Sequence, residues 1–207
     1  MKICVIGTGT MGSGIVLAFA QAGVSVTMKG LTQPELEWGH NNIVKSLTRL
    51  EEKGKIDVGV KEKILSTITE TISYEDCADA DFIIEAILEE ISLKKELFGK
   101  LDKICNPSTI FASNTSSLSI TEIAAATNRA ERVIGMHFFN PAPVMKLVEV
   151  IKGQLTSTKV QQYVYDLAIK IDKTPVNVNE APGFVVNRIL VPLVNEAVGI
   201  LADGVAA

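Results

Sequence analysis

The sequence has few of the residues that build metal centres, disulfide frameworks and nucleic-acid interfaces. It contains three cysteines and two histidines in 207 residues, and no two cysteines are spaced as in a C-x-x-C motif. Scattered cysteines in odd number predict a reducing, cytoplasmic compartment and no metal site. The formal net charge of −4 gives no electrostatic reason to expect a nucleic-acid partner or an anionic membrane surface.

Long apolar runs are also missing. No stretch approaches the roughly 20 apolar residues that cross a membrane. The apolar run after Met1-Lys2 imitates a secretory signal, but it contains regularly spaced glycines and is interrupted by Gln21. With 47% hydrophobic and 21% charged residues, the composition is that of a folded, soluble domain.

Strand-like and helix-like runs alternate, which predicts an α/β fold with a mostly parallel sheet and helices on both faces. The expected strands are Lys2–Ile6, Val24–Met28, Phe82–Ala86, Ile110–Ser113, Val133–His137, Leu147–Ile151 and Val176–Val178. The expected helices are Met11–Ala22, Gln33–Glu52, Leu93–Ile104, Ser119–Ala126, Thr158–Ile171 and Phe184–Leu201, with a charged turn over Glu51–Ile64 that leads into a further helix. The pattern Ser119-x-x-Glu122 predicts a capping box at one helix start.

The first strand-to-helix turn has the pattern G-x-G-x-x-G, with Gly7, Gly9 and Gly12. The first glycine permits a tight bend, the second lets a pyrophosphate approach the backbone, and the third allows the helix to pack closely on the strand. The helix N-terminus offers free N–H groups and a partial positive charge. This context predicts a Rossmann-type dinucleotide-binding unit.

The acid that normally follows such a turn by about 20 residues is missing. That place reads Met28, Lys29, Gly30, Leu31. Gly30 has no carboxylate for a ribose 2′-hydroxyl, whereas Lys29 and Thr32 offer groups that bind a 2′-phosphate. The nearest acid, Glu35, lies inside the expected helix. The pattern therefore leaves NAD(H) and NADP(H) both open as cofactor.

Polar residues follow two later strands, in SNTSSLSI (residues 113–120) and GMHFFNPAPVMKLVEV (residues 135–150). Open α/β sheets bind ligands at the carboxyl ends of their strands. His137 and Glu149 lie on neighbouring predicted strands, and an imidazole held by a carboxylate suits general acid–base chemistry near neutral pH. Spacing alone leaves a structural histidine equally open. His40, in a polar helical segment, is interpreted as a surface residue.

Four runs, VIGTGTMGSGI, ASNTSSLSI, GMHFFNPAPVMKLVEV and EAPGFVVNRIL, together resemble the 3-hydroxyacyl-CoA dehydrogenase family, and within it the bacterial 3-hydroxybutyryl-CoA dehydrogenases. The resemblance covers essentially the whole chain. It implies an oxidoreductase of fatty acid or butyrate metabolism that transfers a hydride between a nicotinamide cofactor and C3 of a short-chain (3S)-3-hydroxyacyl-CoA. The implied catalytic residues are His137 as the base, Glu149 as its orienting carboxylate, and Ser116 and Asn187 at the substrate.

The resemblance also implies the binding residues. The implied cofactor contacts are Gly7, Gly9, Thr10, Met11, Gly12, Lys29, Gly30, Ala86, Ile87, Glu89, Lys94 and Asn114, the last three around the nicotinamide ribose. The implied coenzyme A contacts are Ser46, Lys53 and Ser116. Apart from the resemblance, Lys53 is typical of a solvated surface lysine, and Glu89 with Lys94 of a surface pair.

Residues 1–182 are predicted to form the dinucleotide-binding domain, and residues 183–207 a linker and the first helix of an incomplete all-helical domain. The resemblance implies a homodimer through that helical domain, and we expect this chain by itself to bind cofactor with little turnover. Two alternatives stay open: a dehydrogenase of the same superfamily acting on a 3-hydroxy acid without coenzyme A, and a non-catalytic dinucleotide-binding protein. The basic segment KSLTRLEEKGK argues against the first, and the complete catalytic set against the second.

Overall fold

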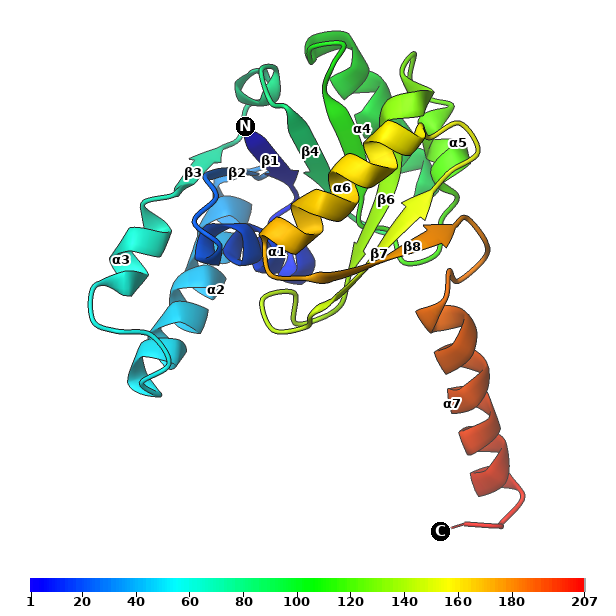
Figure 1. Ribbon diagram of the computed structural model, residues 1–207. Coiled ribbons are helices and arrows are strands. Elements are labelled where there is room, and N and C mark those ends of the chain that lie inside the picture. The colour runs from blue at the N-terminus through cyan, green and yellow to red at the C-terminus, as the bar shows by residue number, and fades with distance from the viewer. Residues whose placement is uncertain (207) are drawn as a thin grey trace.

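The computed structural model describes residues 1–206, which form an eight-stranded sheet with helices on both faces (Figure 1). The strands are β1 (Ile3–Ile6), β2 (Val26–Lys29), β3 (Ile68–Thr71), β4 (Phe82–Glu85), β5 (Ile110–Ser113), β6 (Val133–Phe138), β7 (Leu147–Lys152) and β8 (Thr174–Asn179). The α-helices are α1 (Thr10–Gln21), α2 (Gln33–Glu52), α3 (Val60–Leu65), α4 (Ile91–Ile104), α5 (Ile120–Ala124), α6 (Thr158–Lys170) and α7 (Val186–Ala202). Two short 3₁₀ turns, η1 (Glu75–Cys77) and η2 (Ala130–Arg132), complete the described elements.

The strand order is β3-β2-β1-β4-β5-β6-β7-β8, and every neighbouring pair is parallel except β6 and β7. The carboxyl ends of β1, β4, β5 and β6 therefore meet at one edge of the sheet. Open α/β sheets bind ligands at that edge. The predicted mostly parallel α/β sheet is confirmed.

The two faces of the sheet carry separate hydrophobic cores because successive strand side chains point to opposite faces. In β1, Ile3 and Val5 belong to the core beneath α1, α2 and α6, and Cys4 and Ile6 to the core beneath α4 and α5. The three cysteines are buried and free. Because β1 is buried on both faces, the glycine turn that follows it lies between the two cores.

Three local predictions need correction. An edge strand, β3, lies where no strand was expected. The sequence did not predict it because its residues are partly or fully exposed and lack a run of apolar side chains. Only half of the capping box forms: the Ser119 hydroxyl accepts from the backbone N–H of Glu122, but the Glu122 carboxylate pairs with Lys95. The last helix begins at Val186, because Phe184 has a left-handed backbone with φ of 52°.

The last helix, α7, extends away from the rest of the described chain (Figure 1) and has no buried residue. Its exposed apolar side chains include Ile189, Leu193 and Val194. Within residues 1–206, no helix combines the length and the apolar character needed to cross a membrane.

Candidate active site

The turn between β1 and α1 has the geometry that its glycines predict. Gly7 has φ of +111°, and a Cβ there would lie 2.4 Å from the carbonyl oxygen of Ala86. A Cβ on Gly12 would lie 2.0 Å from the carbonyl oxygen of Gly7, so only glycine lets α1 pack this closely. At Gly9 the Cβ position faces open space, with no contact within 4 Å from the described residues beyond its own stretch of chain, which leaves room for a ligand against the backbone.

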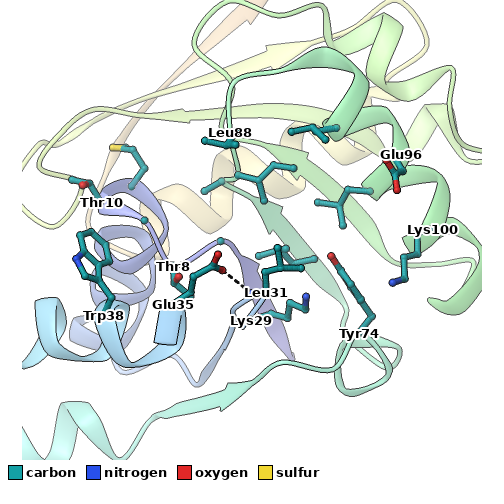
Figure 2. A pocket seen from close by; sticks show the side chains of 18 residues that line it. Thr8, Thr10, Lys29, Leu31, Glu35, Trp38, Tyr74, Leu88, Glu96 and Lys100 are labelled. Carbon is teal, nitrogen blue, oxygen red and sulfur yellow. Dashed lines mark hydrogen bonds between the residues drawn. The ribbon is translucent and has the colours of Figure 1, made fainter. Parts of the chain in front are cut away.

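The N-terminus of α1 opens into a cleft of about 850 Å³ (Figure 2). No side chain among residues 1–206 caps this helix, so its first N–H groups are free to bind phosphate oxygens. Of the predicted cofactor residues, the cleft is lined by Gly7, Gly9, Thr10, Met11, Lys29, Ala86 and Ile87. Gly12, Gly30, Glu89, Lys94 and Asn114 lie outside its lining. The turn formed by Gly7, Gly9 and Gly12, called the glycine cradle below, and the uncapped start of α1 together fit the pyrophosphate of a dinucleotide.

Lys29, at the end of β2, lines the cleft but its side chain is 1% exposed. Its ammonium lies 3.4 Å from the centre of the Tyr74 ring, and that of Lys100 lies 3.8 Å from the same ring. Burial, together with the charge of Lys100, lowers the pKa of Lys29. The lysine is therefore held by an aromatic ring instead of extending into the solvent.

The lining also includes residues that the sequence prediction did not assign to the cofactor site, among them Glu35, Trp38, Tyr74 and Lys100. Glu35 had a usable signal, since Thr32-x-x-Glu35 has capping-box spacing that turns the carboxylate back toward the start of α2. Tyr74 and Lys100 had none, because they reach the cleft from η1 and α4, far along the chain. Trp38 is the only tryptophan of the sequence and lines a second cleft as well.

His137 and Glu149 face each other across the antiparallel pair of β6 and β7. Nδ1 of His137 lies 2.8 Å from Oε2 of Glu149, and the two side chains are 8% and 2% exposed. The Phe139 and Phe184 rings lie 4.5 and 5.9 Å from the imidazole centre. Because Glu149 engages Nδ1, Nε2 is the ring nitrogen left for a ligand oxygen. The arrangement suits a general base whose tautomer is set by a carboxylate.

The second oxygen of Glu149 holds the start of α7. Oε1 accepts from the backbone N–H groups of Val185, at 2.9 Å, and Val186, at 3.0 Å. A carboxylate at a helix N-terminus is favourable because of the helix dipole. Glu149 thus links the imidazole to the segment that contains Asn187, whose side-chain amide donates to the carbonyl oxygen of Ser116 at 3.1 Å.

Ser116 lies in a loop that Glu89 holds in place. Oε1 of Glu89 accepts from the Ser116 N–H at 2.7 Å and from the Thr115 hydroxyl at 2.6 Å, while Oε2 lies 3.2 Å from Lys94 Nζ. Burial works to raise the pKa of Glu89, but the hydrogen bonds from Thr115 and Ser116 and the charge of Lys94 outweigh it and lower the pKa. Asn114, at the start of this loop, accepts from the Phe138 N–H at 2.9 Å.

Lys94 is buried, at 1% exposure, so the surface-pair alternative is wrong for this residue. Its ammonium donates to Oε1 of Glu85 at 2.6 Å, and Glu85 is itself 0% exposed. The other oxygen of Glu85 accepts from the Ser113 hydroxyl at 2.6 Å. A paired, hydrogen-bonded charge of this kind fixes β4, β5 and α4 relative to one another. Lys94 is thus held between Glu85 on β4 and Glu89 on the following loop.

A second cleft, of about 440 Å³, lies between α2 and the loop after β6. Ser46 lines it together with Lys45 and Arg49, and the Ser46 hydroxyl donates to the Asn42 carbonyl at 2.8 Å. Lys53 lies just beyond the end of α2, is exposed, and is not part of the lining. His40, expected at the surface, is half-exposed and pairs with Glu70 at 2.7 Å.

Known proteins are similar to this chain in sequence and in fold. The sequence pattern of the 3-hydroxyacyl-CoA dehydrogenase NAD binding domain matches residues 2–181. The chain belongs to the 3-hydroxyacyl-CoA dehydrogenase family. The 3-hydroxybutyryl-CoA dehydrogenase of Clostridioides difficile is 56% identical over 207 residues, which make up 100% of this chain and 74% of that protein. A probable 3-hydroxybutyryl-CoA dehydrogenase of Bacillus subtilis is 50% identical over 99% of this chain and 71% of its own length.

The crystal structure of (S)-3-hydroxybutyryl-CoA dehydrogenase from Ralstonia eutropha matches the fold with a TM-score of 0.96 at 43% identity. The match covers 100% of this chain and 73% of that one. As a member of this dehydrogenase family, the chain has a nicotinamide-cofactor-binding domain. Within residues 1–206, no three His, Cys, Asp or Glu side chains gather as a metal site would require.

Proposed function

We propose that this protein transfers a hydride between NAD(H) and C3 of a short-chain 3-hydroxyacyl-CoA, with (3S)-3-hydroxybutyryl-CoA and acetoacetyl-CoA as its substrate pair. Support comes from the family of the chain and from relatives named 3-hydroxybutyryl-CoA dehydrogenase at 56% and 50% identity. A dehydrogenase of a 3-hydroxy acid without coenzyme A, or a non-catalytic binding protein, is the alternative.

The observation that carries the proposal is the buried pair of His137 and Glu149 at the same sheet edge as the glycine turn. A nicotinamide bound in the larger cleft would supply the acceptor or the donor of the hydride at C3. His137 takes the 3-hydroxyl proton on Nε2 during oxidation and gives it back during reduction. Glu149 keeps the neutral imidazole protonated on Nδ1 and stabilises the imidazolium that forms. Ser116 and Asn187 are the proposed contacts to the substrate oxygen and acyl group.

In this proposal, each of the two clefts binds a different ligand. The larger cleft takes the dinucleotide, whose pyrophosphate binds the N–H groups at the start of α1. The smaller cleft takes the coenzyme A portion, with Lys45 and Arg49 as cations beside Ser46. Lys53, which lies outside that lining, stays a prediction. Gly30 leaves NADP(H) as the alternative cofactor.

The same domain division is proposed: residues 1–182 bind the dinucleotide and carry the His–Glu pair, and residues 183–207 form a linker and a helix of a separate helical unit. Support comes from the family match over residues 2–181 and from α7, in which no residue is buried. The homodimer and the cytoplasmic location stay predictions.

The test is His137→Gln, with His40→Gln as the matched control, because these are the only two histidines. In the whole protein, His137→Gln is expected to slow acetoacetyl-CoA reduction by roughly a hundredfold or more. NADH affinity should be kept, since His137 does not line the larger cleft. An unchanged rate would remove His137 from the mechanism. Equal rates on acetoacetyl-CoA and free acetoacetate would favour the alternative without coenzyme A.

A further inference from the structure

The end of β2 cannot supply the carboxylate that a dinucleotide-binding fold usually places there. In this fold an acid at that point accepts a hydrogen bond from the ribose 2′-hydroxyl. Here the position is Gly30, and a Cβ on it would lie 2.8 Å from Cγ and 3.3 Å from the backbone N of Leu36. Leu36 is buried in the core, so position 30 has no free space for a side chain.

Glu35 brings a carboxylate to the same corner of the cleft from the first turn of α2. Thr32 caps this helix, accepting from the Glu35 N–H at 3.4 Å. The Glu35 side chain folds back so that Oε2 accepts from the backbone N–H of Leu31 at 3.0 Å. Leu31 directly follows Gly30, and both Leu31 and Glu35 line the cleft. Figure 2 shows the Glu35 carboxylate pointing into the cleft, with this bond dashed.

The two lysines at this corner of the cleft contact an aromatic ring. Lys29 and Lys100 both place their ammonium groups on the Tyr74 ring, at 3.4 and 3.8 Å from its centre. The remaining acid of the lining is Glu96, on α4. Lys29 is 1% exposed, so it has little freedom to turn toward a phosphate, whereas Glu35 is exposed to the cleft. The corner therefore offers a hydrogen-bond acceptor and a negative charge.

We propose that Glu35 is the specificity-determining residue of the cofactor site: its carboxylate accepts the hydrogen bond of the adenosine ribose 2′-hydroxyl and repels a 2′-phosphate. This inference rests on the proposed function, because it requires a dinucleotide in the larger cleft. The acid missing from the strand is thus replaced by one from the following helix, and the protein selects NAD(H) over NADP(H).

The competing role for Glu35 is purely structural, as a helix-capping side chain. The two roles separate in Glu35→Gln, because the amide oxygen still accepts from the Leu31 N–H while the negative charge is lost. A capping residue affects the melting temperature and leaves the ratio of the two cofactor affinities unchanged. A specificity residue changes that ratio. Glu37 lies on the same helix, is exposed and is not part of the lining, so Glu37→Gln is the matched control.

The experiment titrates the chain with NADH and with NADPH and follows the fluorescence of Trp38, the sole tryptophan, which lines the cleft. The wild-type chain and Glu37→Gln are expected to prefer NADH by about tenfold or more, the effect of one charge-assisted hydrogen bond. Glu35→Gln should lose most of this preference, with weaker NADH and tighter NADPH binding.

Two results would overturn the inference: tighter NADPH binding by the wild-type chain, or an unchanged affinity ratio in Glu35→Gln. A lower melting temperature with an unchanged ratio would leave Glu35 as a capping residue only. Failure of the wild-type chain to bind either dinucleotide would instead contradict the cofactor site itself, and with it the proposed function.

Discussion

Replacing Glu149 by glutamine is expected to abolish most of the activity while the fold is kept. Oε1 of Glu149 accepts from two backbone N–H groups, of Val185 and Val186, and Oε2 engages Nδ1 of His137. A glutamine has one acceptor oxygen, and the two N–H donors will take it. Its NH₂ group then faces the imidazole. Nδ1 must become an acceptor, so the neutral ring carries its proton on Nε2 and is no longer a base toward the substrate.

The size of the effect follows from this tautomer change. An amide in place of the orienting carboxylate of a Ser-His-Asp triad costs about 10⁴ in kcat for the same reason. We expect a loss of about 10³ to 10⁴ here, or roughly 4 to 5.5 kcal/mol of transition-state stabilisation. Stability should fall by only about 2 kcal/mol, because two hydrogen bonds to a charged acceptor become neutral ones.

Two measurements check this prediction. The rate of acetoacetyl-CoA reduction in the whole protein measures the catalytic loss. The ¹⁵N shifts of labelled histidine distinguish the two tautomers, and the chain has only His40 as a second signal. The expected spectrum shows His137 protonated on Nε2 and His40 unchanged. A variant that keeps the Nδ1–H tautomer, or loses less than tenfold in rate, would refute the reasoning.

Two further predictions concern the cradle and a buried ion pair. Gly12→Ala is expected to weaken NADH binding by more than tenfold and to lower the melting temperature, because its Cβ would lie 2.0 Å from the Gly7 carbonyl oxygen; unchanged binding in a titration would contradict the role of the cradle. Asp102, 2.6 Å from Arg129, has its pKa lowered from 3.8, since hydrogen bonds from Asn128 and Arg129 outweigh the effect of burial. This stabilisation is present above about pH 4 and is lost as the pH falls through the lowered pKa. Asp102→Asn should therefore cost about 3 kcal/mol near neutral pH, with a melting-temperature difference from wild type that narrows below about pH 4; a constant difference would contradict the assignment.

Local signals predicted the buried elements well. The helix Gln33–Glu52 and the strand Ile110–Ser113 have the predicted bounds because periodicity marks a half-buried helix, and an uninterrupted apolar run marks a buried strand. The edge strand β3 escaped, since an exposed strand has no apolar pattern to detect. Its backbone nevertheless pairs with β2, a long-range contact that no window of local sequence contains.

The residues of the candidate site also separate into those that local sequence predicts and those whose contacts depend on the tertiary structure. The glycine turn was predicted from the sequence, and Gly7 and Gly12 meet the local backbone requirements that the prediction gave them. The family resemblance implied that Glu149 orients His137, but the register that brings Nδ1 to 2.8 Å of the carboxylate comes from sheet pairing. The burial of Lys94 was missed, since a lysine at a helix start resembles a surface residue until its partners on β4 and the following loop are placed.

Sequence alone thus determined the fold class, the phosphate-binding turn and the family resemblance, because these depend on residues close together in the chain or on long matching runs. The tertiary structure decided which side chains lie beside Gly30 at the corner of the larger cleft. Whether the acid missing at Gly30 is replaced depends on the side-chain direction of Glu35 and on the hold that Tyr74 has on Lys29 and Lys100. These groups come from separate elements, and only the packing of those elements brings them to one corner of a cleft.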